Sequence, residues 1–218
     1  MGIAGGDVGR APGISIRPAT ANDAEAVGYL MADAAGPLAA PIWGSGSIER
    51  TRERFAGMFG CWGGSDHHFV ACEDERTVGV IAHTADRMDP WQSLRASLAT
   101  FRVYGVLGSF ALSWRMRHMV SAEPALVRNS YRVWNLAVAE DQRRRGIGSL
   151  LLRHAHRGAR EAGALTIGLE VLIGNAGAIA FYKNAGYRER RRRESAGLRK
   201  MTGAAGLIYM DRAVRDDD

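Results

Sequence analysis

The sequence of 218 residues is poor in lysine, in cysteine and in long hydrophobic runs. Lys183 and Lys200 are the only lysines, so arginine supplies nearly all of the positive charge. Cys61 and Cys72 are the only cysteines and form no C-x-x-C pair, which fits a reducing, cytoplasmic setting. The longest uncharged apolar stretch, residues 103–114, has 12 residues, whereas a helix that spans a bilayer needs roughly 20. We therefore expect no membrane partner, and we predict a buried helix or a lid over a pocket at this stretch.

Metal-ligand patterns are missing as well. Four histidines stand in two close pairs, His67 with His68 and His154 with His156. Neither pair has the H-E-x-x-H context or cysteines at ligand spacing. We therefore expect no metal ion in this protein.

The composition is that of a folded protein, with 46% hydrophobic and 24% charged residues. The length suits one domain. A net charge of +6 and a pI of about 9.8 suit an anionic partner, which is either nucleic acid or a polyphosphate cofactor. Residues 1–13 are glycine-rich and lack an apolar signal core, so we predict a flexible tail before a single domain at residues 14–218.

The spacing of apolar residues predicts alternating strands and helices. Strands are expected at residues 14–18, 69–73, 77–84, 131–138, 165–172, 187–193 and 206–211, and helices at about 22–35, 48–60, 149–162 and 176–184. Two prolines and three glycines predict a loop at residues 36–46. Together these elements predict a mixed α/β sheet with helices on both faces.

An insertion at residues 86–128 separates the third and fourth expected strands. Apolar side chains recur there every three or four residues, which predicts a helix with Gly105 and Gly108 as candidate breaks. The stripe consists of Trp91, Leu94, Leu98, Phe101, Tyr104, Leu107, Phe110 and Trp114. Besides a lid, this apolar stripe leaves a homodimer contact open.

A glycine-bearing turn follows the expected strand at residues 131–138. It contains Arg143-Arg144-Arg145-Gly146-Ile147-Gly148 and leads into a helix. Glycines let backbone approach a ligand closely, and the amides at a helix N-terminus favour phosphate. With three arginines beside them, these features predict a cofactor that carries phosphate.

Two motifs together resemble the Gcn5-related N-acetyltransferase (GNAT) family. The run Arg143-x-x-Gly146-x-Gly148 matches the family element (Gln/Arg)-x-x-Gly-x-(Gly/Ala), which grips the pyrophosphate of acetyl-CoA. Asn175, followed by Ala180-Phe181-Tyr182 and Gly186-Tyr187, is similar to the second CoA-binding element. The core motifs are most similar to the ribosomal-protein alanine N-acetyltransferase branch. In most members a short turn replaces the insertion seen here, so the resemblance does not identify the acceptor.

The resemblance implies a single-domain acyl-CoA N-acyltransferase fold with a mixed, mostly antiparallel sheet, and direct transfer of an acetyl group to a primary amine. Glu170 would be the general base and Tyr182 the general acid that protonates the departing thiolate. Strand amides at residues 136–138 would bind the acetyl carbonyl and its oxyanion. The expected acetyl-CoA contacts are Leu136, Ala137, Val138, Arg143, Arg144, Arg145, Gly146, Ile147, Gly148, Ser149, Asn175 and Tyr182.

Three of the expected site residues also have a simpler, structural interpretation. Glu170 could lie on the polar face of its strand, Tyr182 could be helix packing, and Asn175 could cap the helix that follows it. A non-catalytic acyl-CoA sensor and a basic nucleic-acid-binding module are therefore the alternative functions. The basic run at residues 188–193 has no interleaved aromatics or DNA-binding motif, so we expect a solvated strand end and no nucleic acid partner.

Overall fold

The structure is a computed structural model that describes residues 13–44, 46–62, 67–85, 90–120 and 129–215. Its strands are β1 (Ile14–Pro18), β2 (His68–Glu73), β3 (Arg76–Thr84), β4 (Ser130–Val138), β5 (Thr166–Leu172), β6 (Arg188–Glu194) and β7 (Gly206–Ala213). Its helices are α1 (Ala24–Ala35), α2 (Ile48–Trp62), α3 (Pro90–Val120), α4 (Ile147–Glu161), α5 (Ala176–Asn184) and α6 (Ala196–Thr202). Short helical turns are η1 (Ala21–Asp23), η2 (Gly36–Leu38), η3 (Ala39–Trp43) and η4 (Glu140–Gln142). Most of the predicted tail lies outside the described residues.

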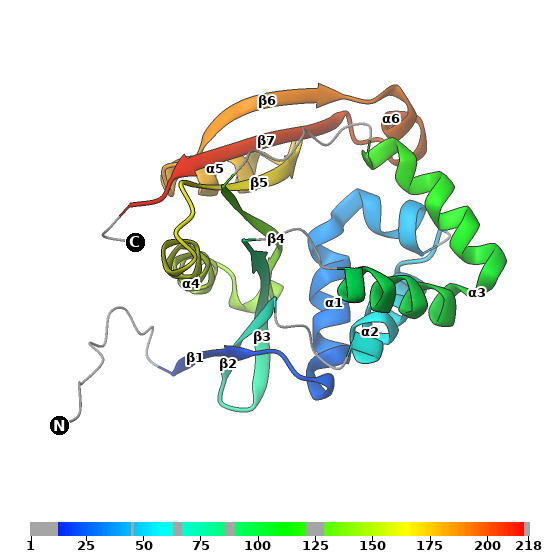
Figure 1. Cartoon of the computed structure of the whole chain (residues 1–218), viewed down its shortest axis with the longest axis horizontal. Helices are drawn as coiled ribbons and strands as arrows, with labels where there is room; N and C mark the ends of the chain where they lie inside the picture. The colour runs from blue at the N-terminus through cyan, green and yellow to red at the C-terminus, as the bar shows by residue number, and fades with distance from the viewer. Residues whose placement is uncertain (1–12, 45, 63–66, 86–89, 121–128, 216–218) are drawn as a thin grey trace.

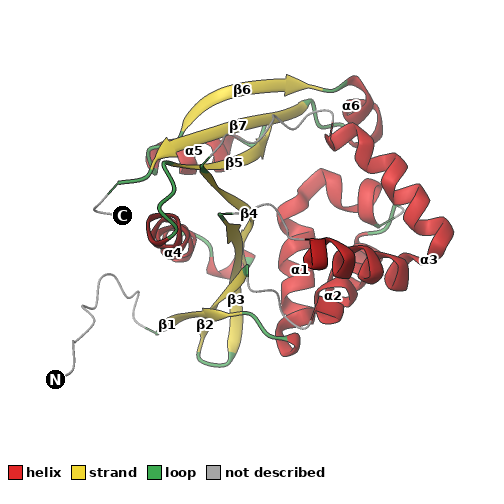
Figure 2. Cartoon of the chain, in the orientation of Figure 1, coloured by secondary structure: helices red, strands yellow, loops and turns green. Residues whose placement is uncertain are grey.

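Within the described residues, seven strands form one sheet in the order β1-β2-β3-β4-β5-β7-β6. Among these strands, β4 and β5 pair in parallel and the other neighbours pair antiparallel. The helices cover both faces, as the secondary-structure view makes plain (Figure 2). This confirms the predicted mixed, mostly antiparallel sheet with a helical insertion between the third and fourth strands.

The two faces of the sheet have separate hydrophobic cores. Helix α4 lies on one side of β3 and β4, and helices α1 and α2 lie on the other (Figure 1). The α4 core includes the buried residues Ile81, Leu151 and Leu169, whereas the α1–α2 core includes Val27 and Phe59. Because successive strand residues point to opposite faces, this division tells which side of the sheet each polar side chain occupies.

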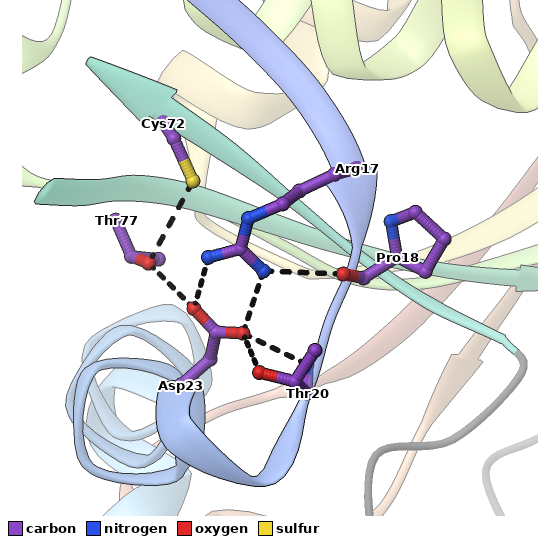
Figure 3. Close-up of polar contacts among 6 residues, drawn as sticks. All are labelled: Arg17, Pro18, Thr20, Asp23, Cys72 and Thr77. Atoms are coloured by element: carbon purple, nitrogen blue, oxygen red, sulfur yellow. Dashed lines mark hydrogen bonds and ion pairs between the residues drawn. The ribbon is translucent and has the colours of Figure 1, made fainter. Parts of the chain in front are cut away.

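The start of the chain is fastened to the sheet through Asp23, which is 4% exposed (Figure 3). Both of its carboxylate oxygens accept hydrogen bonds of 2.8 Å from Arg17, and Thr20 and Thr77 also donate to it. Burial alone would raise the pKa of Asp23, but the hydrogen bonds from Arg17, Thr20 and Thr77 outweigh burial and hold it well below its usual value. One carboxylate thereby joins β1, the turn before α1, and β3.

The insertion forms α3, which is kinked at one predicted break. Gly105 has φ 66° and ψ 177°, a conformation that only glycine adopts readily, so two helical arms meet there. The first arm packs on α2, and the second packs on η3 and α6 (Figure 1). Leu112 is buried in the second arm, in a small core with Leu38, Ile42 and Leu198.

The outward side of α3 corrects the prediction of a buried helix at residues 103–114. Among the insertion side chains that the structure describes, seven large apolar ones are exposed, with Leu107 reaching 85% and Phe110 69%. We call them the α3 ridge: Leu94, Leu98, Phe101, Val106, Leu107, Phe110 and Trp114. The smaller residues Ala99 and Ser109, together with Leu112, form the buried side instead. None of the helices in the described ranges is long and apolar enough to cross a membrane.

Candidate active site

The parallel strands β4 and β5 stay together for only part of their length. Their pairing runs from Ser130 with Thr166 to Val133 with Leu169. Beyond these pairs β4 continues along β3, and β5 continues along β7. The strands therefore splay apart at residues 134–138 and 170–172, which opens the centre of the sheet.

A β-bulge lies in β4 at the point where the strands separate. The register with β3 passes from Trp134–Ala82 to Ala137–Val80, so β4 has one residue more than β3 between these pairs. Asn135, inside the bulge, has a φ of 44° and an exposed side chain. Bulges of this kind bend a strand and redirect its groups, and they are common beside active sites.

A pocket of about 240 Å³ occupies the splay, and we call it the central pocket. It brings together Leu136 of β4, Glu170 of β5, and Asn175 and Tyr182 of the α5 region. Met119, near the end of α3, also lines it, so the insertion does reach the pocket. Four residues singled out in the sequence thus share one cavity.

Glu170 lies on the α1–α2 side of the sheet, because its neighbours Leu169 and Val171 pack into the α4 core. Its side chain is 12% exposed, and its Oε2 atom accepts a hydrogen bond of 3.2 Å from Nη2 of Arg132. Tyr209 of β7 stands directly opposite Glu170 in the sheet register. The carboxylate is therefore held in place at the wall of the central pocket.

Tyr182 reaches the central pocket from the α4 core. It is 8% exposed, and burial raises the pKa of its phenol to about 12. The hydroxyl is therefore protonated at neutral pH, so it has a proton to donate. Its packing against Phe181 and Tyr187 agrees with the structural interpretation, and its place in the pocket lining is compatible with the functional one.

The glycine turn forms the N-terminus of α4. Gly146 has φ 82°, and no heavy atom lies within 4 Å of the position that a Cβ would take. The amides of Ile147, Gly148 and Ser149 belong to the first helical turn, where an α-helix provides them with no internal partner. Amides of this kind suit an anion, as the sequence analysis expects of this turn.

The three arginines of the turn have different surroundings. Arg143 donates through Nε to the carbonyl oxygen of Val138 at 3.2 Å, and Arg144 is exposed with a φ of 65°. Arg145 pairs with Glu73 of β2 at 2.6 Å and also donates to Gln142. The charge of Arg145 is thus shared with a carboxylate.

Asn175 caps α5, as its simpler interpretation predicts. Its Oδ1 atom accepts from the backbone N–H of Ala178 at 3.1 Å. A carboxamide that caps through its oxygen keeps its NH₂ group as a donor. Asn175 is exposed and lines the central pocket, so capping and ligand contact are compatible.

The histidines are packing residues. His83 hydrogen-bonds the hydroxyl of Tyr131 at 2.7 Å, and burial lowers its pKa to about 3. His156 contacts the hydroxyl of Tyr187 at 3.0 Å, and burial lowers the pKa of His68 to about 4. In the part of the chain that the structure describes, no three histidine, cysteine or acidic residues form a group that could hold a metal ion.

Part of the basic run on β6 is neutralised locally. Arg190 pairs with Asp211 at 2.7 Å, and Arg192 pairs with Glu189 at 3.0 Å. These contacts agree with the prediction of a solvated strand end.

Comparisons with known proteins agree with this fold. The sequence model of the acetyltransferase (GNAT) family matches residues 37–187, so the chain belongs to that family. The [ribosomal protein bS18]-alanine N-acetyltransferase of Salmonella typhimurium is 42% identical over 57 residues, which are 26% of this chain and 38% of that protein. The same enzyme of Escherichia coli K12 is 33% identical over 81 residues, or 37% of this chain and 55% of that protein.

The chain thus matches about half or less of the length of these curated relatives. Among solved structures, yncA of Salmonella typhimurium, determined with its cofactor acetyl-CoA, superposes with a TM-score of 0.57. The sequence identity is 16%, and the alignment covers 94% of this chain and 95% of that chain. This likeness shows a shared fold.

Several pocket residues were missed in the sequence. Arg132 and Asn135 read as ordinary strand positions, and Trp43 lies in a segment predicted to be loop. A signal was available for Asn135, because asparagine tolerates a positive φ better than most residues. Trp43 gave no local signal, because its role depends on contacts with residues far away in the chain.

Proposed function

We propose that the protein is an acetyl-CoA-dependent N-acetyltransferase that acetylates a primary amine by direct attack in a ternary complex. The acceptor is the amine of a small molecule or the N-terminus of a peptide or protein. The observation that carries the proposal is the splay of β4 and β5, which opens a pocket that has the Glu170 carboxylate in its wall. When bound, acetyl-CoA supplies the activated thioester.

The residues at the splay fit this cosubstrate. The open backbone site at Gly146 suits a pyrophosphate, and Arg143 and Arg144 add positive charge beside it. Between Leu136 and Val138, β4 has left β5, so its backbone amides on that side can donate to the acetyl carbonyl. Asn175 adds a side-chain donor to the lining of the central pocket.

Glu170 removes the proton that the attacking amine must lose. Alkyl amines are mostly protonated at neutral pH, and a protonated amine is not a nucleophile. Glu170 lies on the α1–α2 side of the sheet, in the same pocket as the expected carbonyl donors. It acts directly or through one water molecule.

Tyr182 supplies a proton to the departing sulfur from the other side of the sheet. Its phenol keeps its proton at neutral pH, as an ordinary tyrosine with a pKa near 10 does, and burial raises the pKa of Tyr182 further, to about 12. Base and acid thus stand on opposite faces of the sheet, so each can serve one partner without exchanging protons directly with the other.

The experiment compares two glycines at the two ends of α4. Gly146→Asp places a negative charge at the proposed pyrophosphate site, whereas Gly163→Asp places it at the far end of the same helix. Both glycines have a positive φ, 82° and 65°, and both face open space, so the two changes carry similar backbone strain. Calorimetry should show at least a tenfold loss of acetyl-CoA affinity for Gly146→Asp and little change for Gly163→Asp. Equal affinities in both variants would contradict the cofactor site.

A turnover assay distinguishes an acetyltransferase from a non-catalytic acyl-CoA sensor. Release of free CoA thiol is measured with peptides, polyamines, aminoglycosides and amino acid amides as acceptors. An acetyl-CoA complex that acetylates none of them would favour the non-catalytic sensor. Salt-dependent retention on DNA without acetyl-CoA binding would favour the nucleic-acid module.

A further inference from the structure

A second, smaller pocket opens beside the central pocket, on the α1–α2 side of the sheet. We call it the side pocket, and its volume is about 180 Å³. Its apolar lining comes from α1, η3 and α2 and consists of Met31, Ala35, Trp43, Phe55, Met58 and Phe59. No charged side chain lines it among the described residues.

The two pockets are neighbours that share three lining residues. Ala35, Trp43 and Asn135 line both of them, and Asn135 is the residue inside the β4 bulge. A group attached to a molecule in the central pocket therefore has the side pocket as its nearest apolar neighbour, with Asn135 at the boundary.

The lining defines the chemistry of that group. An engineered cavity of 150 Å³ with aliphatic and aromatic walls stays dry and binds benzene, so about 180 Å³ holds a benzene ring or a branched chain of similar size. Met31 and Met58 add flexible thioethers, which adapt to apolar groups of irregular shape. A charged or strongly polar group would lose its hydration there without gaining a partner.

The position of the pocket favours the amine as the carrier of this group. The side pocket lies on the face of the sheet that holds Glu170, the proposed base. The Gly146 turn leads into α4, on the opposite face. A group bonded near the reacting nitrogen therefore enters this side together with the amine.

The insertion holds the wall between the two pockets in place. The carbonyl oxygen of Trp43 accepts hydrogen bonds from Nη1 of Arg54 at 2.6 Å and from the hydroxyl of Tyr104 at 3.0 Å. The Arg54 guanidinium lies 4.5 Å from the centre of the Tyr104 ring. The Trp43 ring packs against Phe55 with ring centres 5.4 Å apart. Tyr104 belongs to α3, so α3 fixes a side-pocket residue through main-chain contacts.

We propose that the side pocket binds a compact apolar group of the acceptor amine, aliphatic, thioether or aromatic, and that Tyr104 of the insertion is a positioning residue for it. The effect on turnover rests on the proposed function, whereas the binding of the amine can be tested independently of it. The same apolar chemistry could instead be the tail of a longer acyl group, so the test has one arm for each source.

The first arm varies the amine at constant acetyl-CoA. Glycinamide, alaninamide, leucinamide and phenylalaninamide share a reacting group and differ in apolar bulk. We expect kcat/KM to be at least tenfold higher for leucinamide than for glycinamide, since even one buried methylene changes specificity by roughly 10–200-fold. Met58→Trp fills the pocket and should abolish that preference while leaving glycinamide within about threefold. Met116→Trp changes a partly buried methionine outside both pockets and should keep the preference.

The second arm varies the acyl group at constant amine, with acetyl-, propionyl- and butyryl-CoA. We expect no change of this profile in Met58→Trp. A variant that loses butyryl transfer but keeps its amine preference would overturn the assignment to the acceptor. A wild-type protein that treats all four amides alike would overturn the pocket's role altogether.

The conservative variant Tyr104→Phe distinguishes a positioning role of Tyr104 from a purely structural one. Tyr104→Phe keeps the ring beside Arg54 but removes the hydrogen bond to Trp43. It should raise KM for leucinamide several-fold, with kcat and acetyl-CoA affinity nearly unchanged. An equal loss for glycinamide and leucinamide would contradict positioning.

Binding without turnover keeps this inference separate from the proposed function. Ligand-observed NMR measures leucinamide and glycinamide binding to the wild type and to Met58→Trp. Selective leucinamide binding that Met58→Trp abolishes supports the side pocket even if no amine is acetylated, in which case the proposed function alone fails. Equal binding of both amides to both proteins refutes the side pocket.

Discussion

Glu170 and Tyr182 meet the central pocket from opposite sides of one sheet, and each has a separate test. General acid–base steps typically contribute about 10²–10⁴-fold in rate. We therefore expect Glu170→Gln to lower kcat at least tenfold at neutral pH and to leave acetyl-CoA affinity within a few fold. The loss should shrink at high pH, where the amine loses its proton unaided. Glu161→Gln, an exposed change on α4, is the control, and full kcat in Glu170→Gln would refute the base assignment.

Tyr182→Phe keeps the ring and removes only the donor. Because the ring packs among Phe181 and Tyr187, we expect the thermal stability to change little. We expect kcat to fall at least tenfold in a thiol-release assay, because the departing sulfur loses its proton source. A drop in acetyl-CoA affinity with unchanged kcat would instead assign Tyr182 to binding.

The buried Asp23 carboxylate should make the free energy of unfolding sensitive to acid. Asp23→Asn should lower the free energy of unfolding by about 2 kcal/mol at pH 7, since hydrogen bonds to buried charged groups contribute roughly 1.5–3 kcal/mol. Asp33→Asn breaks a pair with Arg52 that is about one third exposed and should cost less than about 1 kcal/mol. Urea unfolding of both variants measures the difference.

The direction of the pH dependence follows from the lowered pKa of Asp23. The unfolded carboxyl titrates near 3.9, so the native state binds fewer protons than the unfolded state below that value. The contribution of Asp23 is complete above about pH 4 and is lost as pH falls toward its lower native pKa. The gap between wild type and Asp23→Asn should therefore narrow in acid. A gap that widens below pH 4 would contradict the network in Figure 3.

At the scale of elements, the kink in α3 depends on one glycine. Gly105 adopts φ 66° and ψ 177°, so Gly105→Ala should cost about 1–3 kcal/mol of stability. Gly60→Ala, in α2, should instead be neutral or stabilising by up to about 1 kcal/mol, because a Cβ there meets only ordinary contacts. Denaturant unfolding measures the stability of both variants. Equal changes in the free energy of unfolding would mean that the kink does not require glycine at position 105.

Elements with strong local boundary signals were predicted well. β1 has the predicted ends, and α5 begins after the Asn175 cap and ends before Gly186. The segment at residues 36–46 was wrongly predicted as loop: it contains η2 and η3, because proline is tolerated in the first turn of a helix. α6 was missed, since its seven residues are too short for a clear period.

Features that depend on tertiary contacts could not be predicted locally. The apolar period of α3 predicted a helix with candidate breaks at Gly105 and Gly108, and a buried helix or a lid at residues 103–114. In the structure the smaller Ala99 and Ser109 face the neighbouring elements. The convergence of Leu136, Glu170, Asn175 and Tyr182 was expected from the family resemblance, whereas the side pocket needed the coordinates.

At the scale of the whole molecule, charge and apolar surface are unevenly distributed. The net charge is +6, yet Arg17, Arg145 and Arg190 are paired with carboxylates, as are several other arginines. A homodimer through the insertion stays a prediction from the sequence, and sedimentation at several protein concentrations tests it. The predicted cytoplasmic location likewise stays a prediction.

The α3 ridge has a practical consequence for the laboratory. Dyes such as ANS, whose fluorescence increases when they bind apolar surface, normally fluoresce weakly until a protein unfolds. On the folded protein Leu107 is 85% exposed and Phe110 is 69% exposed, so the α3 ridge can bind such dyes before the sample is heated. Melting curves recorded with these dyes should therefore start from a bright baseline that mimics partial unfolding, whereas intrinsic tryptophan fluorescence or calorimetry of the same sample would report an ordinary folded state.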